Sequence, residues 1–380
     1  MFEQFGNEMG DLNKAIRKAG ISFKGRIVSI TGSSGKSLTA HFLYGILSAS
    51  GYKTAAYLNC FPGFPSNLLL SYKDYPRFDE SLLKIASKCG LSLGQAQFLL
   101  SFKAAEDCDF FIIEHDIGGL SSSCYFDDLY SDLTVLTSTG LDHVELLGTT
   151  ESGIALDCVS LCPVSSRLLS YDLGELTLPP VKEYCEANDV TWTKADLCHY
   201  PHLEGDDFVF EYFPYKDLHI PYIGRIAVED AGLAIEAARI LLPDLKEEDV
   251  KSGLAISPLP YHLSKKGDVY FDLASSPEQA YGLSRSAQTL AKNGPVSVIY
   301  GARKGSNVSA ILPLLDNAFA EVFLSTVPGD SSYWDEDDFA LFVADHPFVS
   351  DIKSHIASHP GTYLIVGEKG FVFHAEKEIG

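Results

Sequence analysis

The sequence predicts an α/β fold made of two parallel-sheet domains, the first of which carries a phosphate-binding loop. Apolar, strand-like runs alternate with helix-like segments, the pattern of a parallel sheet covered on both faces. A Gly- and Ser-rich turn at 32–37 separates the first such strand from the first long helix. A proline cluster at 257–260 then precedes a second, shorter series of the same kind. We therefore expect domains at residues 1–258 and 259–380.

Bulk properties narrow the class of protein. The chain has 380 residues, of which 46% are hydrophobic and 21% charged, as in ordinary globular proteins. Its net charge of −22 argues against a nucleic-acid partner, because no basic cluster offsets the acidic field. The N-terminus lacks a signal-peptide pattern, and no apolar run approaches about 18 residues. We expect a cytoplasmic monomer with no membrane partner.

The turn at 32–37 has the composition of a phosphate-binding loop. Strand-like residues 27–31 precede it and helix-like residues 38–50 follow it, so backbone N–H groups and a helix dipole point at one spot. The spacing G-x-x-G-K-S is shorter than the usual G-x-x-x-x-G-K-[ST]. We predict ATP and Mg²⁺ as cofactors, with Lys36 on the outer phosphates and Ser37 on the metal; a chance turn is the alternative. The predicted nucleotide-binding residues here are Gly32, Ser33, Ser34, Gly35, Lys36 and Ser37.

Two more polar side chains follow predicted strands of the first domain. Glu114 ends the apolar run 109–114, and His143 comes after the run 132–137. Ligands bind beyond the carboxyl ends of parallel strands, so both should emerge beside the loop. With Ser37 they would hold one or two divalent ions against ATP phosphates. Taken singly, Glu114 is explained as well by a helix cap, and His143 better by a structural histidine.

The remaining elements follow from periodicity and from Gly and Pro positions. In the first domain we expect an N-terminal amphipathic helix within 1–24, and a less regular region at 165–224 with an antiparallel strand at 207–213. The other elements expected there are helices at 81–89, 93–105 and 228–242 and a strand at 54–58. In the second domain we expect strands at 268–272, 296–300, 320–326 and 363–366, and helices at 278–291, 308–316 and 351–357.

One long stretch resembles a known signature. Residues 139–150 read Thr-Gly-Leu-Asp-His-Val-Glu-Leu-Leu-Gly-Thr-Thr, and Ile154-Ala155 follows. This is similar to the G-[LI]-D-H-x-x-x-L-G-x-T-x-x-x-I-A signature of folylpolyglutamate and dihydrofolate synthases, members of the Mur ligase superfamily. Residues 98–119, with Glu114 and then Gly118-Gly119, resemble the same family's strand ending in E-x-G-x-G-G. The resemblance covers most of the chain.

The resemblance implies Mur ligase architecture, with a P-loop central domain and a smaller Rossmann-like C-terminal domain. It implies an ATP-dependent, ADP-forming ligase of one-carbon metabolism, whose partners are a folate-like acid and an amino acid, glutamate. In that family the acid's carboxylate attacks ATP to give an acyl phosphate, and the amine then displaces phosphate. By this resemblance Lys36 and His143 are catalytic, Ser37, Glu114 and His143 surround magnesium, and Asp272 reaches the ribose.

Several positions depart from the family pattern. Cys158 falls where the family has a lysine that is carbamylated to bridge a second metal, Asp230 replaces an asparagine, and His262 replaces an arginine. Three hypotheses therefore stand. The chain is a folylpolyglutamate synthase-like ligase, a Mur-type ligase for a different acid and amino acid, or a catalytically impaired nucleotide-binding homologue that acts through partners.

Overall fold

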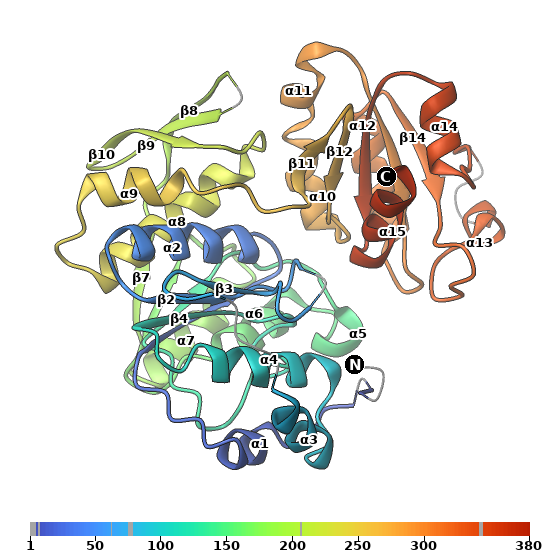
Figure 1. Cartoon of the computed structure of the whole chain (residues 1–380). Helices are drawn as coiled ribbons and strands as arrows, with labels where there is room; N and C mark the ends of the chain where they lie inside the picture. Colours follow the sequence, from blue (N-terminus) through green and yellow to red (C-terminus); the bar gives the residue numbers. More distant parts are fainter. Residues whose placement is uncertain (1–4, 7, 62, 75–78, 206, 342–344) are drawn as a thin grey trace. The chain divides into compact units, whose positions relative to one another are not determined.

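The chain folds into two compact units, seen in a computed structural model that describes residues 5–6, 8–61, 63–74, 79–205, 207–341 and 345–380 (Figure 1). The first unit comprises the chain up to His199 together with Glu211–Leu218 and Glu229–Ile256. The second comprises Tyr200–Phe210, His219–Val228 and Ser257–Gly380. Each unit contains its own sheet and is described separately.

The first unit is built on a seven-stranded sheet in the order β3-β2-β4-β1-β5-β6-β7. All neighbouring strands are parallel except β3, which runs antiparallel to β2 at the edge. The central strands are almost fully buried because helices cover both faces, which explains their continuous apolar text. The strands are β1 (Arg26–Thr31), β2 (Thr54–Tyr57), β3 (Leu68–Leu70), β4 (Phe110–Glu114), β5 (Leu133–Leu136), β6 (Arg167–Ser170) and β7 (Thr191–Lys194).

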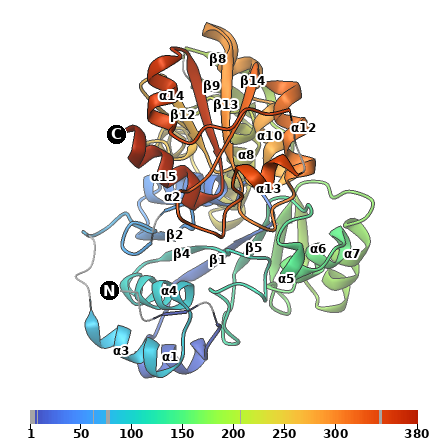
Figure 2. The same ribbon diagram turned by 90° about the vertical axis from the view of Figure 1, so that its right-hand side faces the viewer.

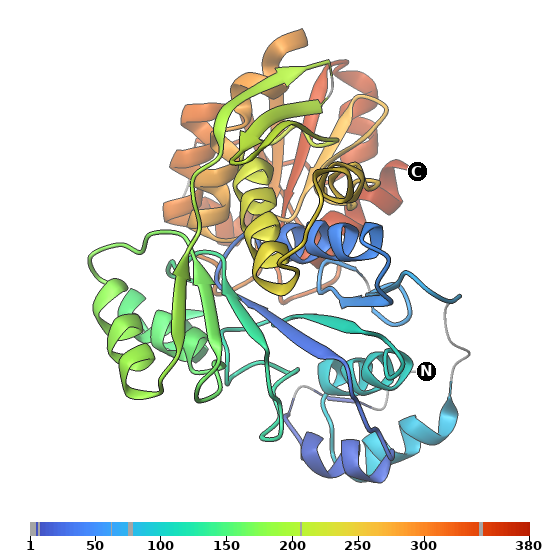
Figure 3. The same cartoon turned by 90° about the vertical axis from the view of Figure 1, so that its left-hand side faces the viewer.

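Helices cover both faces of this sheet (Figures 1 and 3). One face carries α2 (Lys36–Ala49), α9 (Glu247–Leu254) and α8 (Ile226–Leu241), whose residues from Glu229 onward belong to this unit. On the other face, Phe98 and Phe102 of α4 stack on Phe111 of β4 at 6.3 and 5.7 Å between ring centroids. That face carries α1 (Leu12–Lys18), α3 (Glu80–Lys88), α4 (Leu93–Ala104), α6 (Glu151–Val159) and α7 (Leu178–Ala187). Among the described residues, no helix is both long and apolar enough to cross a membrane.

The expectation of an irregular region at 165–224 was wrong for its first half. There β6, α7 and β7 continue the parallel sheet. The sequence pattern predicted these elements poorly because α7 has prolines in its first turn, and because β7 is a short, polar edge strand, Thr-Trp-Thr-Lys. The strand expected at 207–213 is confirmed as β9 (Asp207–Tyr212). It lies between β10 (Tyr215–Ile220) and β8 (His199–Glu204) in a three-stranded sheet.

The second unit is a five-stranded sheet in the order β11-β12-β15-β13-β14, parallel except for the edge strand β11. Its strands are β11 (His262–Lys266), β12 (Val269–Asp272), β13 (Val296–Gly301), β14 (Glu321–Ser325) and β15 (Thr362–Gly367). Helices cover both faces of this sheet (Figure 2), and a separate hydrophobic cluster lies on each face. One lies under α10 (Pro277–Ser284), α11 (Ala287–Leu290) and α12 (Val308–Ala318), and the other under α14 (Ile352–Ser358) and α15 (Lys369–Ile379).

Two expectations for this unit are corrected. The single helix expected at 278–291 is broken into α10 and α11 at Arg285–Ser286. The chain also continues past β15 into α15, a helix that the pattern did not predict. Glycines at 367 and 370 weaken the local helix signal, and the helix is stabilised by burying Phe371 and Val372 against the sheet.

Candidate functional site

The predicted phosphate loop joins the central strand β1 to helix α2 and requires glycine at both of its glycine positions. Gly32 has φ +128°, and a Cβ there would lie 2.4 Å from Thr137 Oγ1. Gly35 has φ +83° and caps the N-terminus of α2, which begins at Lys36. Both backbone conformations favour glycine. The loop therefore turns tightly enough to bring the positive end of α2 to the carboxyl edge of the sheet.

Hydrogen bonds fix this loop to the segment that follows β5. The backbone N–H of Ser33 donates to Ser138 O at 2.9 Å, and that of Ser34 donates to Ser138 Oγ at 3.0 Å. Ser33 Oγ donates to Gly140 O at 3.1 Å and accepts from Gly140 N at 3.0 Å. The loop and the 138–140 segment are thus held together, and the N–H groups of Ser33 and Ser34 are already engaged in this structure.

Ser37 and Glu114 meet at the carboxyl ends of β1 and β4. Ser37 Oγ, in the first turn of α2, donates to Glu114 Oε1 at the end of β4 at 2.8 Å. Only 4% of Glu114 is exposed, and its other carboxylate oxygen accepts the backbone N–H of Asn59 at 2.8 Å. The Asn59 side-chain amide also donates to Glu114 O at 2.7 Å. The carboxylate is therefore held in one orientation by donors from two segments of the chain, the start of α2 and the loop after β2.

The donor set at Ser37 and Glu114 fits magnesium. Among the described residues, no three His, Cys, Asp or Glu side chains gather as a metal-binding group. Mg²⁺ does not need such a cage, since it is usually bound by one or two protein oxygens together with substrate phosphates and water. A hydroxyl and a carboxylate oxygen 2.8 Å apart, next to a helix N-terminus, supply hard oxygen ligands of that kind.

His143 lies after β5, as expected, but its contacts are local. It begins the short helix α5 (Val144–Leu147) with φ +47°, and its backbone N–H donates to Asp142 Oδ1 at 3.0 Å. Its ring nitrogens lie 3.9 Å from Asp142 Oδ1 and 3.7 Å from Glu145 Oε1, and 39% of the side chain is exposed. In the described part of the chain it makes no hydrogen bond or ion pair with Ser37 or Glu114. Its metal role stays a prediction.

Lys36 and Cys158 both lie against the phosphate loop. Lys36 Nζ donates to Gly32 O at 2.7 Å, so the ammonium group lies against the loop that it is predicted to assist. Cys158, on α6, is 1% exposed. Burial raises the pKa of its thiol, whereas Thr31, Lys36 and the Gly32 backbone lower it. The thiol thus occupies a buried position beside the end of β1 and beside Lys36.

Asp272 belongs to the second unit, at the end of β12. Its carboxylate accepts backbone N–H groups from Ala274 at 3.0 Å and from Leu263 at 3.1 Å. Burial nevertheless raises its pKa to about 7. The carboxyl shapes the turn after β12, and its contact with a ribose stays a prediction.

Sequence reasoning did not single out Asn59 and Ser138, although both contribute to the site. Each follows a strand of the central sheet, β2 and β5, and so emerges at the same edge as the phosphate loop. Position after a buried strand was the available signal. Nothing local, however, distinguishes these side chains from ordinary loop residues.

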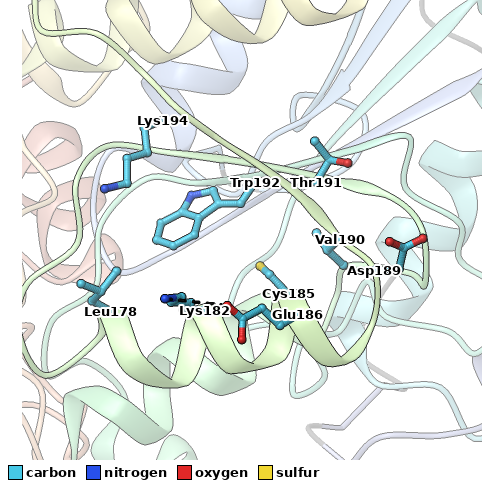
Figure 4. Close-up of a pocket in the computed structure, with 9 residues that line it drawn as sticks. All are labelled: Leu178, Lys182, Cys185, Glu186, Asp189, Val190, Thr191, Trp192 and Lys194. Atoms are coloured by element: carbon cyan, nitrogen blue, oxygen red, sulfur yellow. Dashed lines mark ion pairs between the residues drawn. The ribbon is translucent and has the colours of Figure 1, made fainter.

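A separate pocket of about 580 Å³ lies between α7 and the edge strand β7 (Figure 4). In it Lys194 Nζ lies 5.5 Å from the centre of the Trp192 ring, and Lys182 pairs with Glu186 at 3.7 Å. In the sheet order, β7 is separated from β1 by β5 and β6. None of the predicted site residues lines this pocket. Its lining residues are Leu178, Lys182, Cys185, Glu186, Asp189, Val190, Thr191, Trp192 and Lys194.

Comparison with curated proteins confirms the resemblance to folylpolyglutamate and dihydrofolate synthases. The chain is 25% identical over 341 residues to the folylpolyglutamate synthase of Lacticaseibacillus casei, covering 80% of this chain and 78% of that protein. It is 24% identical over 321 residues to the dihydrofolate synthase/folylpolyglutamate synthase of Escherichia coli, covering 80% and 73%. No protein-family model matches the chain.

Solved structures confirm the predicted Mur ligase fold. A folylpolyglutamate synthase of Mycobacterium tuberculosis, complexed with ADP and AMPPCP, aligns with a TM-score of 0.83 at 17% identity, over 97% of this chain and 94% of that one. A folylpolyglutamate synthase–AMPPCP complex aligns with a TM-score of 0.80 at 21% identity, over 99% and 97%. At these identities the alignments show the architecture.

Proposed function

We propose that this chain is an ATP-dependent ligase that joins L-glutamate to the carboxylate of a folate-type acceptor and releases ADP and phosphate. The hydrogen bond between Ser37 and Glu114 at the phosphate loop is the observation that carries the proposal, because it places two metal-compatible oxygens where a nucleotide phosphate would bind. Similarity to the named synthases over 80% of the chain favours this ligase over a Mur-type ligase for another acid.

The reaction needs neutralised charge and alignment rather than a protein nucleophile. The acceptor carboxylate attacks the γ-phosphate of ATP, which gives an acyl phosphate and ADP. The amine of glutamate then attacks the acyl carbon, and phosphate leaves. Lys36 and the N-terminus of α2 place positive charge at the phosphates, and Asn59 keeps Glu114 oriented. Magnesium bound at Ser37 and Glu114 supplies further neutralisation of the phosphate oxygens.

We also propose that the reaction takes place in the cytoplasm. None of the eight cysteines forms a disulfide in this structure, and seven of them are buried. Cysteines kept out of disulfides in this number are typical of proteins in a reducing compartment.

ADP release by the purified chain tests the proposed activity. With Mg-ATP, release should require both a reduced folate or pteroate acceptor and L-glutamate. Lys36→Ala should lower turnover on the order of 100-fold, the usual cost of losing one group that stabilises charge in the transition state. Lys84→Ala, the same substitution at an exposed position of α3, should leave turnover unchanged.

Each other outcome has a defined meaning. Full turnover by Lys36→Ala would refute the assignment of the site. Turnover with a different acid and amino acid would show that the chain is a Mur-type ligase for those substrates and would refute the folate-type acceptor. Calorimetric binding of Mg-ATP without turnover on any acceptor would support an impaired homologue, for which the buried Cys158 gives a reason, since a thiol forms no carbamate.

A further inference from the structure

Asp230 is a buried acid that lies directly on the phosphate loop. It belongs to the second turn of α8, and only 5% of it is exposed. A Cβ placed on Gly35 would lie 2.2 Å from Asp230 Oδ1, so the carboxyl occupies the space that a side chain at Gly35 would fill. Gly35 is also the residue that caps the N-terminus of α2.

The described side chains around Asp230 are acidic or neutral. In the part of the chain that the structure describes, the carboxyl has no ion-pair partner, and its Oδ2 is buried without a hydrogen-bond partner. The titratable groups around it are Glu229 on its own helix and Tyr171 and Cys198 from neighbouring segments. Thr39 of α2 contributes a neutral hydroxyl. An ionised Asp230 would therefore be an anion at the loop with no cationic side chain paired to it.

An ionised Asp230 would repel a phosphate that binds at the loop. The N-terminus of α2 carries the positive end of the helix dipole, which attracts one negative group. If Asp230 is ionised, it takes up this positive potential and repels a phosphate, whereas the protonated carboxyl does neither. Phosphate binding and ionisation of Asp230 are then thermodynamically linked, each weakening the other.

We propose that Asp230 is a proton-linked positioning residue of the phosphate loop: the loop binds a nucleotide phosphate tightly while this carboxyl is protonated and weakly once it is ionised. The proposal rests on the proposed nucleotide-binding function, which it deepens by assigning a regulator of that site. Burial, and then the charge of Glu229, raise the pKa of Asp230 well above its usual value, while the nearby Thr39 hydroxyl lowers it. The neutral form is thus the one that the fold favours.

Titration calorimetry of Mg-ADP and Mg-ATP from about pH 6 to about pH 10 tests this linkage. Asp230→Asn keeps the size of the side chain but cannot ionise, so the ratio of its affinity to that of the wild type removes the nucleotide's own titration. We expect a ratio near one at the acidic end. As the pH rises through the pKa of Asp230, the wild type should lose up to about tenfold in affinity per pH unit relative to the variant. Asp244→Asn, at an exposed position just after α8, should follow the wild type.

A second measurement needs no nucleotide. Because the pKa of Asp230 is raised in the folded state, the free energy of unfolding of the wild type should fall with rising pH relative to Asp230→Asn, and should level off once the folded carboxyl is ionised. The pH at which this difference levels off should equal the pH at which the affinity ratio starts to rise.

The outcomes separate the two proposals. An affinity ratio that is constant over the whole pH range, or a stability difference that does not change with pH, overturns the role of Asp230 and leaves the nucleotide site standing. If neither protein binds nucleotide at any pH, both proposals fail.

Discussion

The crossing of helices α2 and α9 gives the strongest test of how the loop is held in place. A Cβ on Gly253 of α9 would lie 2.4 Å from both the N and the Cα of Ile46, and a Cβ on Gly45 of α2 would lie 2.2 Å from Gly253 O. Ordinary contact begins at 3.4 Å, so Gly253→Ala would force the helices apart by about 1 Å. Because backbone atoms clash, no rotamer change relieves them.

Gly253→Ala should lower the free energy of unfolding, although helix propensity alone would raise it. In a helix, Gly→Ala normally stabilises by about 1 kcal/mol. Overpacking against backbone costs about 1–3 kcal/mol or more, and separating the helices also loses contacts along the crossing. We expect a net loss of about 2 kcal/mol in the free energy of unfolding of the first unit, about 30-fold in its folding equilibrium. Weaker ATP turnover should accompany the loss, since α2 begins at Lys36.

Urea denaturation followed by tryptophan fluorescence measures this change. The chain has two tryptophans, so a Trp334→Phe background leaves Trp192 as the reporter for the first unit. Gly282→Ala is the control: it is the same substitution in a helix of the second unit, where a Cβ would meet Ile226 at an ordinary 3.7 Å, and it should leave the unfolding of the first unit unchanged. If Gly253→Ala is as stable as Gly282→Ala, the close helix crossing is not a constraint and the reasoning is wrong.

Two further predictions concern side-chain oxygens. Ser37→Ala removes a donor to the buried Glu114 carboxylate and should cost about 1–3 kcal/mol of unfolding free energy along with most ATP turnover. Ser48→Ala on the same helix, whose hydroxyl donates to Tyr44 O, should change neither. Equal behaviour of the two variants in denaturation and ADP-release assays would contradict the assignment. Burial raises the pKa of Asp272 in the folded protein to about 7, above its unfolded value of about 3.9. The protonated carboxyl therefore contributes fully to the free energy of unfolding below about pH 4, and this contribution is lost as the pH rises to about 7. Asp272→Asn should therefore gain stability relative to the wild type across that window in urea titrations, unlike Asp268→Asn at an exposed position, and a pH-independent difference would refute the shift.

Much of the architecture follows from local sequence patterns. The buried strands β1, β4 and β5 are continuous apolar runs because both sheet faces are covered, and such runs are legible without the structure. Elements that are stabilised mainly by packing against other elements cannot be recognised from the sequence in this way. The polar edge strand β7 and the C-terminal helix α15 have sequences that only weakly favour a strand or a helix, and both form because they pack against a sheet.

The same division applies to the candidate site. The sequence alone was sufficient to predict the turn at Gly32–Ser37 and a carboxylate at the end of β4, since strand ends in a parallel sheet share one edge. Which of these groups touch depended on tertiary structure: Ser37 meets Glu114, whereas His143 lies among its own chain neighbours. The contact of Asp230 with Gly35 joins residues nearly 200 positions apart, because the packing of α8 beside α2 brings them together. Periodicity describes one element at a time, and a contact between two elements depends on how both are packed.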